Sequence, residues 1–325
     1  MKAIVCNGFG PLEELVYDDV ADPAPGRDEV LIRTEASGVN FPDGLLVQGL
    51  YQSKPPAPFT PGMEVAGEIV ALGEGVTGLS VGQKVAAVTS MSGYAELAVV
   101  GADKVFVLPD GTDPADACAL LVAYGTSHHA LKQRAALKPG ETLVVFGAAG
   151  ATGVAAVQIG KIMGAKVIAV ASSDDKRKIA TDCGADFAIS YDGLKDKIKE
   201  LTNGKGADVV YDVVGGDAFA AASRFMARNG RLLVIGFASG EIPKLPVNLT
   251  LVKEYAVVGV FWGNFTRAEP AVYRDNMVEL LNWYAEGKVK PLIEGRYPLV
   301  DAPSVLDRIL NRGAVGKIVL VPEGA

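Results

Sequence analysis

The length, composition and charge of the chain exclude several classes of protein. Its 325 residues are enough for two domains, and 49% hydrophobic with 21% charged residues is typical of globular proteins in water. A net charge of −7 argues against a nucleic-acid partner. Every long apolar run is interrupted by glycine or charge, so we expect no membrane partner.

The N-terminus and the cysteines favour a cytoplasmic location. Met1 to Val5 enter a strand pattern directly and lack the long apolar region of a signal peptide. Cys6, Cys118 and Cys183 lie far apart and form no metal-ligand pair. This cysteine usage suits a reducing compartment.

Residues 1–121 have the pattern of a β-rich domain. Glycine and proline separate short apolar runs, a pattern typical of a small barrel or sandwich. The segment from Phe41 to Pro61 is long, rich in proline and carries Tyr51, so we interpret it as a functional loop. The expected strands are Lys2–Val5, Glu29–Ala36, Val65–Leu72, Lys84–Val88 and Tyr94–Val100.

Residues 122–261 alternate between strand and helix patterns, which predicts right-handed βαβ units and a doubly wound parallel sheet. The expected strands are 143–146, 167–171, 187–190, 209–214, 231–235 and 257–261, with helices at 153–163, 175–183, 194–201 and 218–228. Residues 262–325 offer helices at 273–286 and 302–311 and a strand at 317–321. These elements are too few for a core of their own, so we expect them to complete the first domain.

A glycine-rich turn joins the first of these strands to its helix. Leu143 to Phe146 predict a buried strand, and a mostly apolar helix follows the last glycine. Such a turn lets backbone N–H groups approach a pyrophosphate, whose charge the helix N-terminus favours. The alternative is an ordinary glycine-rich turn. The candidate cofactor-binding residues are Gly147, Ala148, Ala149, Gly150, Ala151, Thr152 and Gly153.

The end of the second strand favours NADPH over NADH. An acidic residue there would bind the ribose hydroxyls of NAD, but Ser172 and Ser173 stand in its place and Lys176 follows. Small hydroxyls and a cation suit a 2′-phosphate. Ser173 can also cap the next helix while the cations face solvent, and the two roles can hold at once. Tyr191, after the third strand, is a candidate for the same phosphate site.

With these features the sequence resembles the zinc-free, zeta-crystallin-like quinone oxidoreductase branch of the medium-chain dehydrogenase/reductase superfamily. The resemblance covers essentially the whole chain. It implies a Rossmann sheet inserted in a GroES-like β-rich catalytic domain made of residues 1–121 and 262–325. It rests on the segments 38–43 (Gly-Val-Asn-Phe-Pro-Asp), 61–67 (Pro-Gly-Met-Glu-Val-Ala-Gly), 148–153, 171–176 and 316–320.

The residues in two of these motifs argue against a catalytic zinc. Related alcohol dehydrogenases need a cysteine in the first motif and a histidine in the second, where this chain has Asn40 and Met63. An amide and a thioether do not make a three-ligand zinc site with an open position. Glu64 alone cannot hold the metal, so we expect it to serve packing or a hydrogen bond, and we predict no metal site.

The resemblance also indicates residues near the reacting atoms. Asn40 matches an asparagine near the nicotinamide, with a loop amide that bonds the backbone as the alternative. Tyr51 is similar to a candidate proton donor, with a binding or wall role as the alternative. Thr126 matches a threonine at the nicotinamide ribose or phosphate, with a helix N-cap as the alternative. Further cofactor candidates, which follow strand ends or match the terminal lysine, are Phe237, Phe261, Trp262, Gly263 and Lys317; a solvated lysine is the alternative for the last.

The function that the resemblance implies is hydride transfer from NADPH to a quinone or another conjugated carbonyl acceptor, in a cleft between the domains. The alternatives are an enoyl-CoA or enone (2-alkenal) reductase and a non-enzymatic NADPH-binding protein of the same fold. The family commonly dimerises by pairing edge strands. Residues 257–261 are the last predicted strand of the sheet and are apolar, so we expect a homodimer.

Overall fold

The computed structural model describes residues 1–89 and 91–324. The chain forms two compact units, one of Met1–Val122 with Pro291–Ala325 and one of Ala123–Lys290. Within the described ranges, no helix is both long enough and apolar enough to cross a membrane.

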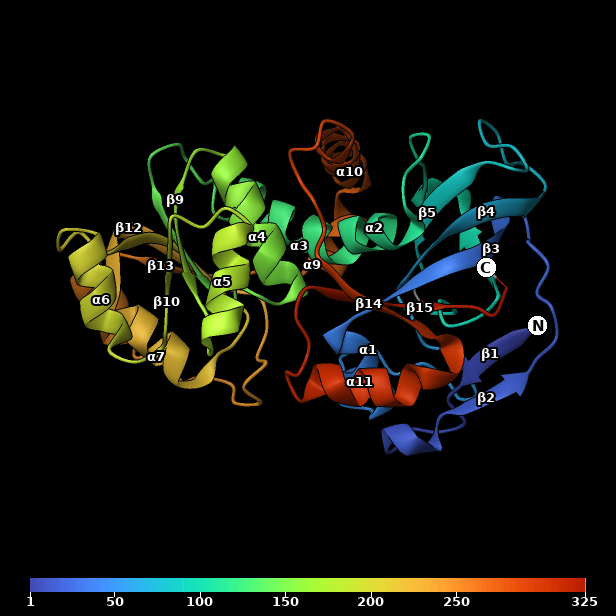
Figure 1. Cartoon of the computed structure of the whole chain (residues 1–325), viewed down its shortest axis with the longest axis horizontal. Coiled ribbons are helices and arrows are strands. Elements are labelled where there is room, and N and C mark those ends of the chain that lie inside the picture. The colour runs from blue at the N-terminus through green and yellow to red at the C-terminus, as the bar shows by residue number, and fades with distance from the viewer. Residues whose placement is uncertain (90, 325) are drawn as a thin grey trace. The chain divides into compact units, whose positions relative to one another are not determined.

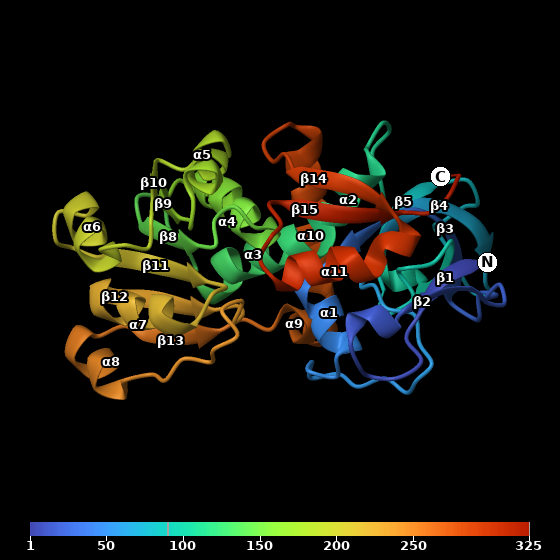
Figure 2. The ribbon, with the colours of Figure 1, turned by 60° about the horizontal axis from the view of Figure 1, so that its bottom comes forward.

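The first unit is built on a mostly antiparallel sheet (Figures 1 and 2). Its strands follow the order β14-β15-β3-β4-β5-β7, and β6 also pairs with β3. A separate antiparallel pair, β1 and β2, lies at the N-terminus. The strands are β1 (Lys2–Val5), β2 (Val16–Asp19), β3 (Glu29–Val39), β4 (Glu64–Leu72), β5 (Lys84–Val88), β6 (Leu97–Gly101), β7 (Val105–Val107), β14 (Ile293–Pro298) and β15 (Lys317–Val321).

Short helices cover this sheet: α1 (Phe41–Val47), α2 (Pro114–Ala119) and α11 (Ala302–Leu310). The predicted loop from residue 41 to 61 is therefore wrong over its first third, because Asn40 and the proline at position 42 start a helix. Single 3₁₀ turns occur at Leu12–Glu14, Ala102–Lys104 and Leu299–Asp301.

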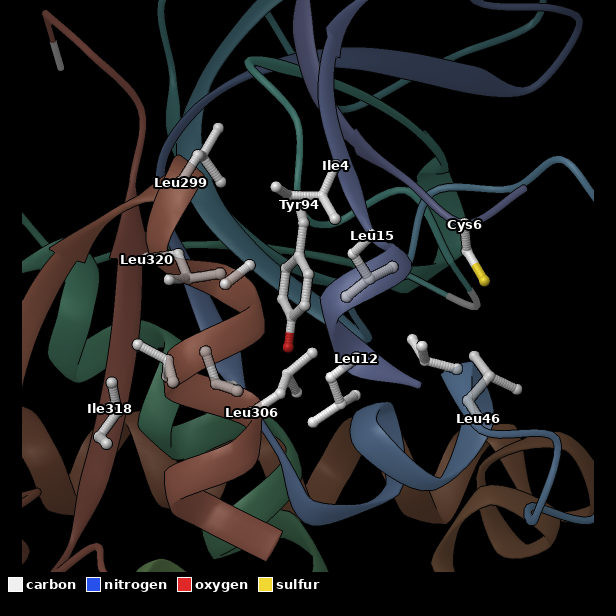
Figure 3. Close-up of a cluster of buried hydrophobic side chains, with 14 of the residues drawn as sticks. Ile4, Cys6, Leu12, Leu15, Leu46, Tyr94, Leu299, Leu306, Ile318 and Leu320 are labelled. Carbon is white, nitrogen blue, oxygen red and sulfur yellow. The ribbon is translucent and has the colours of Figure 1, made fainter. Parts of the chain in front are cut away.

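One hydrophobic core of this unit surrounds the ring of Tyr94 (Figure 3). Leu12 and Leu15, from the N-terminal segment, and Leu306 and Leu320, from the C-terminal segment, pack in the same cluster. The two ends of the chain are therefore tied into one core. Tyr94 itself is fully buried, which leaves its hydroxyl in need of a protein partner.

The second unit contains the predicted parallel sheet, with the strand order β10-β9-β8-β11-β12-β13. In Figure 1 its strands lie between α4 and α5 on one side and α6 and α7 on the other. The elements are β8 (Thr142–Phe146), α4 (Ala151–Ile162), β9 (Lys166–Val170), α5 (Asp174–Asp182), β10 (Phe187–Ile189), α6 (Leu194–Leu201), β11 (Ala207–Asp212), α7 (Gly216–Phe225), β12 (Met226–Val234), α8 (Val247–Lys253) and β13 (Ala256–Gly259).

Helices before and after the sheet complete the unit: α3 (Gly125–His129), α9 (Trp262–Ala268) and α10 (Pro270–Ala285). π-helical turns at Leu120–Tyr124 and Ala130–Arg134 flank α3. Apolar residues of β8 and β9 pack against α6 and α7 in one core. All the strands are parallel, so their carboxyl ends share one edge, where ligands of doubly wound sheets bind.

The predicted boundary at residue 262 differs from this division into units. Residues 262–290 belong to the second unit because α9 and α10 pack against α3. Only β14, α11 and β15 return to the first unit. Three elements, α8, α9 and β14, were not predicted from the sequence. The predicted helix at 218–228 is too long, because α7 ends at Phe225 and β12 begins at Met226.

Candidate functional site

A buried polar cluster lies in the first unit at the end of β3. We call Asn40, Asp43, Glu64, Tyr94 and Lys317 the Asn40 cluster; all five side chains are buried. The sheet brings three of them together: Asn40 follows β3, Glu64 begins β4 and Lys317 begins β15. β3 pairs with both β4 and β15, so these strand ends lie side by side. Asn40 and Lys317, which are 277 positions apart in the sequence, thus form a hydrogen bond.

The side-chain amide of Asn40 is held at both ends. Its Nδ2 donates to Glu64 Oε1 at 3.0 Å, and its Oδ1 accepts from Lys317 Nζ at 2.7 Å. Lys317 also forms a close ion pair with Glu64, whose other oxygen accepts from the Val122 N–H at 2.8 Å. The interpretation of Lys317 as a solvated lysine is therefore wrong: its side chain is only 2% exposed and fully engaged.

Asp43 and Tyr94 complete the cluster beneath Asn40. Asp43 Oδ2 accepts from the Asn40 N–H at 2.8 Å and from the Tyr94 hydroxyl at 2.8 Å. Burial raises the pKa of Asp43 to about 7, against the opposing effect of those two hydrogen bonds. Burial also raises the pKa of Tyr94 well above its usual value, so it stays a hydrogen-bond donor. Sequence reasoning missed Asp43, although an acidic residue three positions after an N-cap is a recognisable signal.

Tyr51, the candidate proton donor, lies on the chain that follows α1. It is half-buried and packs against the hydrophobic core that includes Leu46 and Val47. The side chain of Tyr51 is therefore partly packed and partly exposed. This environment is compatible with either of the two roles that the sequence left open.

The glycine turn of the second unit has the form that an anion site needs. Gly147 adopts φ +62° directly after β8, and its N–H donates to the Tyr191 hydroxyl at 3.0 Å. Gly150 starts α4 without a side-chain cap from any described residue. The first N–H groups of a helix have no acceptor within it, so those of Ala151, Thr152 and Gly153 remain for a ligand.

Close packing leaves no room for a side chain at position 153, the last glycine of the turn. A Cβ on Gly153 would lie 2.2 Å from the Gly147 carbonyl oxygen and 2.8 Å from the Ala148 Cα. Both neighbours are backbone atoms and cannot rotate away. A glycine here lets α4 approach the end of β8, where Ala148 and Ala149 are buried.

α3 supports the same turn from the side. Ser127 donates its hydroxyl proton towards the Thr152 carbonyl, at 2.9 Å, and lies 2.9 Å from the buried Tyr211 hydroxyl. Thr126, the neighbouring residue, is half-buried in the interior of α3. The N-cap alternative for Thr126 is therefore wrong, because the chain is already helical at Tyr124.

The candidate phosphate-selecting residues lie at the carboxyl end of β9. Ser172 and Ser173 are exposed, and the Ser173 hydroxyl accepts from the Lys176 N–H at 3.3 Å, so Ser173 does cap α5. Arg177 folds back over the strand end: its Nη1 donates to the Ala171 carbonyl at 3.2 Å, and its Nη2 pairs with Asp174. A guanidinium thus lies beside the two serines.

The residues after β12 and β13 have differing environments. Phe237 is half-buried beside Gly215, and Phe261 is 53% exposed just before α9. Trp262 is buried, with its ring in edge contact with Tyr273 and its Nε1 without a partner in residues 1–89 and 91–324. The Trp262 ring also lies against Gly125, at the start of α3, so the structure brings it close to Thr126. Gly263 follows in the first turn of α9.

Two family models match the chain. The zinc-binding dehydrogenase model matches residues 151–283, and the model of the alcohol dehydrogenase GroES-like domain matches residues 26–110. A quinone oxidoreductase-like protein 2 homolog of Nematostella vectensis is 39% identical over 98% of this chain and 88% of its own length.

Solved structures are similar over the whole chain. A mycobacterial protein in complex with NADPH is 32% identical with a TM-score of 0.93, covering 99% of this chain and 100% of that one. The quinone oxidoreductase of Escherichia coli in complex with NADPH is 27% identical with a TM-score of 0.91, again covering 99% and 100%.

Proposed function

Because the chain belongs to the quinone oxidoreductase-like branch of the medium-chain dehydrogenase/reductase superfamily, we propose that it transfers hydride from NADPH to a quinone or another conjugated carbonyl acceptor. The observation that carries the proposal is the glycine turn that leads from β8 into α4 with uncapped N–H groups. The two similar structures that contain NADPH, and the oxidoreductase names of the relatives, support the same assignment.

Different residues of the second unit would bind the pyrophosphate and the 2′-phosphate of the cofactor. The N–H groups of Ala151, Thr152 and Gly153 would hold the pyrophosphate at the positive end of the α4 dipole. Ser172, Ser173 and Lys176 would bind the 2′-phosphate through hydroxyl and ammonium donors. The Tyr191 hydroxyl fixes the conformation of the turn by accepting from Gly147.

The zinc that the matched family model names does not fit this chain. Asn40 and Met63 stand where a thiolate and an imidazole would be required. Glu64, the remaining carboxylate, is already ion-paired with the buried Lys317 ammonium. A second cation beside that ammonium would be repelled, so the proposed reaction uses no metal.

The first unit would supply positioning and proton chemistry. Bound NADPH would supply the hydride that reduces the acceptor. Asn40 would orient the acceptor carbonyl or the carboxamide of the cofactor through its free oxygen lone pair and its second N–H, which makes only a long contact of 3.5 Å with the Gly38 carbonyl oxygen. Tyr51 would donate a proton to the oxygen or carbon that becomes anionic when the hydride arrives.

Direct binding and turnover measurements test the proposal. Purified protein should quench NADPH fluorescence and gain thermal stability with NADPH more than with NADH, and should oxidise NADPH with at least one acceptor from a panel of quinones. The absence of both binding and turnover would refute it. Turnover only with enones or enoyl-CoA, and with no quinone, would replace it with the alternative, an enone or enoyl-CoA reductase.

We also propose that the protein is a homodimer. β13 ends the parallel sheet and exposes a strand edge, and exposed apolar side chains of α8 lie just before it in the chain: Val247 at 69%, Leu251 at 79% and Val252 at 75%. An apolar strand edge needs a cover. Light scattering at micromolar concentration should give twice the 33.8 kDa chain mass. A cytoplasmic location remains a prediction from the sequence.

A further inference from the structure

Asn40 has a geometry that fixes its orientation in advance of any ligand. A side-chain amide can normally rotate by half a turn and exchange its oxygen and nitrogen. Here Glu64 offers only acceptors to one end and Lys317 offers only donors to the other, at 3.0 and 2.7 Å. The exchanged orientation would place the amide oxygen against a carboxylate and its N–H groups against an ammonium. Only one orientation is therefore stable.

The backbone around the pair is shaped to permit this arrangement. A Cβ on Gly38 would lie 2.1 Å from Glu64 Oε1, so a glycine is required for the carboxylate to reach Asn40. The Asn40 N–H is itself held by Asp43, which fixes the backbone from which the amide projects. Other members of the Asn40 cluster thus hold the backbone N–H, the side-chain nitrogen and the side-chain oxygen of Asn40.

Removing the Glu64–Lys317 ion pair from water costs free energy, so its presence calls for a role other than stability. Glu64 is 0% exposed and Lys317 is 2% exposed. Replacing buried ion pairs by apolar residues of similar volume is often neutral or stabilising, so stability alone is weak grounds for keeping one. A fixed amide orientation is a role that apolar side chains cannot fill.

We propose that Glu64 and Lys317 are positioning residues that lock the Asn40 amide. The second N–H of that amide makes only a long contact of 3.5 Å with the Gly38 carbonyl oxygen. This N–H and one oxygen lone pair are thereby held in a defined direction for the carbonyl of the acceptor or the carboxamide of the cofactor. This inference rests on the proposed function, because it assigns Asn40 to the reacting groups. It also changes the expected role of Lys317, which the resemblance had placed among the cofactor-binding residues. The ammonium is instead occupied by Glu64 and Asn40.

The test removes both partners of Asn40 without leaving a buried charge. Glu64→Leu/Lys317→Met should fold and bind NADPH, since the glycine turn is untouched, but should lose roughly 10–100-fold in kcat/KM through misorientation. Asn40→Ala should lose a similar factor. The triple variant should lose no more than Asn40→Ala alone, because the pair acts only through that amide.

A matched control separates this effect from general damage to the sheet. Arg33 and Glu68 pair across the same two strands, β3 and β4, at 2.9 Å on a more exposed part of the sheet. Arg33→Met/Glu68→Leu should keep kcat/KM within about threefold, the range of ordinary surface changes. If Glu64→Leu/Lys317→Met behaves like this control, or if its loss multiplies with that of Asn40→Ala, the proposal is wrong.

A measurement without turnover distinguishes failure of this inference from failure of the proposed function. In cofactor-free protein labelled with ¹⁵N-asparagine, the Asn40 side-chain signals can be identified by their loss in Asn40→Ala. They should be protected from solvent exchange, and should shift and lose protection in Glu64→Leu/Lys317→Met. Unchanged signals would overturn the positioning role. Inactivity of the wild-type protein with every acceptor would overturn only the proposed function.

Discussion

Replacing Gly153 by alanine should disrupt the glycine turn even in the absence of cofactor. The added Cβ would lie 2.2 Å from the Gly147 oxygen and 2.8 Å from the Ala148 Cα. Ordinary contacts between carbon atoms are about 3.5 Å or longer, so α4 would have to move by about 1 Å. Overpacking of this kind costs about 1–3 kcal/mol, and we expect the upper end because both obstructing groups are backbone. For a unit of this length, ~3 kcal/mol corresponds to a fall in Tm of roughly 6–12 °C.

The matched control is Gly150→Ala, three residues earlier in the same turn. A Cβ there would meet only the Gly147 oxygen at 3.4 Å, and Gly150 has φ −78°, which alanine adopts readily. Its cost should be about 1 kcal/mol or less, from the weaker N-cap. Thermal and denaturant unfolding of both cofactor-free variants, followed by NADPH titration, makes the comparison. Equal Tm values for Gly153→Ala and the wild type would refute the close-packing argument.

Other predictions concern the cofactor phosphate, the proton donor and the pH dependence of stability. Lys176→Ala should weaken NADPH binding by about tenfold and leave NADH binding nearly unchanged, since one charge-assisted hydrogen bond is lost; equal losses in fluorescence titrations would contradict the assignment. Tyr51→Phe should lower kcat and leave the Kd for NADPH unchanged; an unchanged kcat in steady-state assays would leave Tyr51 a wall residue. Burial lowers the pKa of His128 to about 4, so only the unfolded chain binds its proton between about pH 6.5 and 4. The free energy of unfolding should therefore fall by ~3 kcal/mol as the pH falls through that window, and urea titrations of His128→Gln should show a smaller fall.

The parallel sheet was predictable from sequence because most of its strands are short apolar runs. The exception is β12 (Met226–Val234), whose first half, Met-Ala-Arg-Asn-Gly, lacks that pattern and was not predicted. A strand that is buried on both faces is a continuous apolar run, which can be recognised from the local sequence alone. The glycine turn was predictable for a related reason: Gly147, Gly150 and Gly153 stand between a strand and a helix pattern. The structure starts α4 two residues earlier than predicted, at Ala151, so Gly153 lies in the first turn of the helix. α8 escaped prediction because its apolar residues Val247, Leu251 and Val252 are exposed and mark no buried face. α9 has only seven residues, so its two buried side chains, Trp262 and Phe265, are too few to reveal a helical period in the sequence.

The Asn40 cluster was only partly predictable, because its contacts join distant parts of the chain. Asn40 and Glu64 stood out through motifs, but nothing local to Lys317 indicates that it lies buried against them. The partners are brought together by the pairing of β15 with β3, which is a property of the folded sheet. Likewise, the proximity of Trp262 to the start of α3 depends on the packing of α9 and α10 in the second unit.

The most direct test of the account is a side-by-side measurement of NADPH and NADH with the purified wild-type protein, in binding by fluorescence and in turnover with a quinone panel. The account predicts tighter binding of NADPH and NADPH-dependent reduction of at least one quinone without added metal, unaffected by a chelator. Preference for NADH, or activity that disappears with the chelator and returns with zinc, would contradict it.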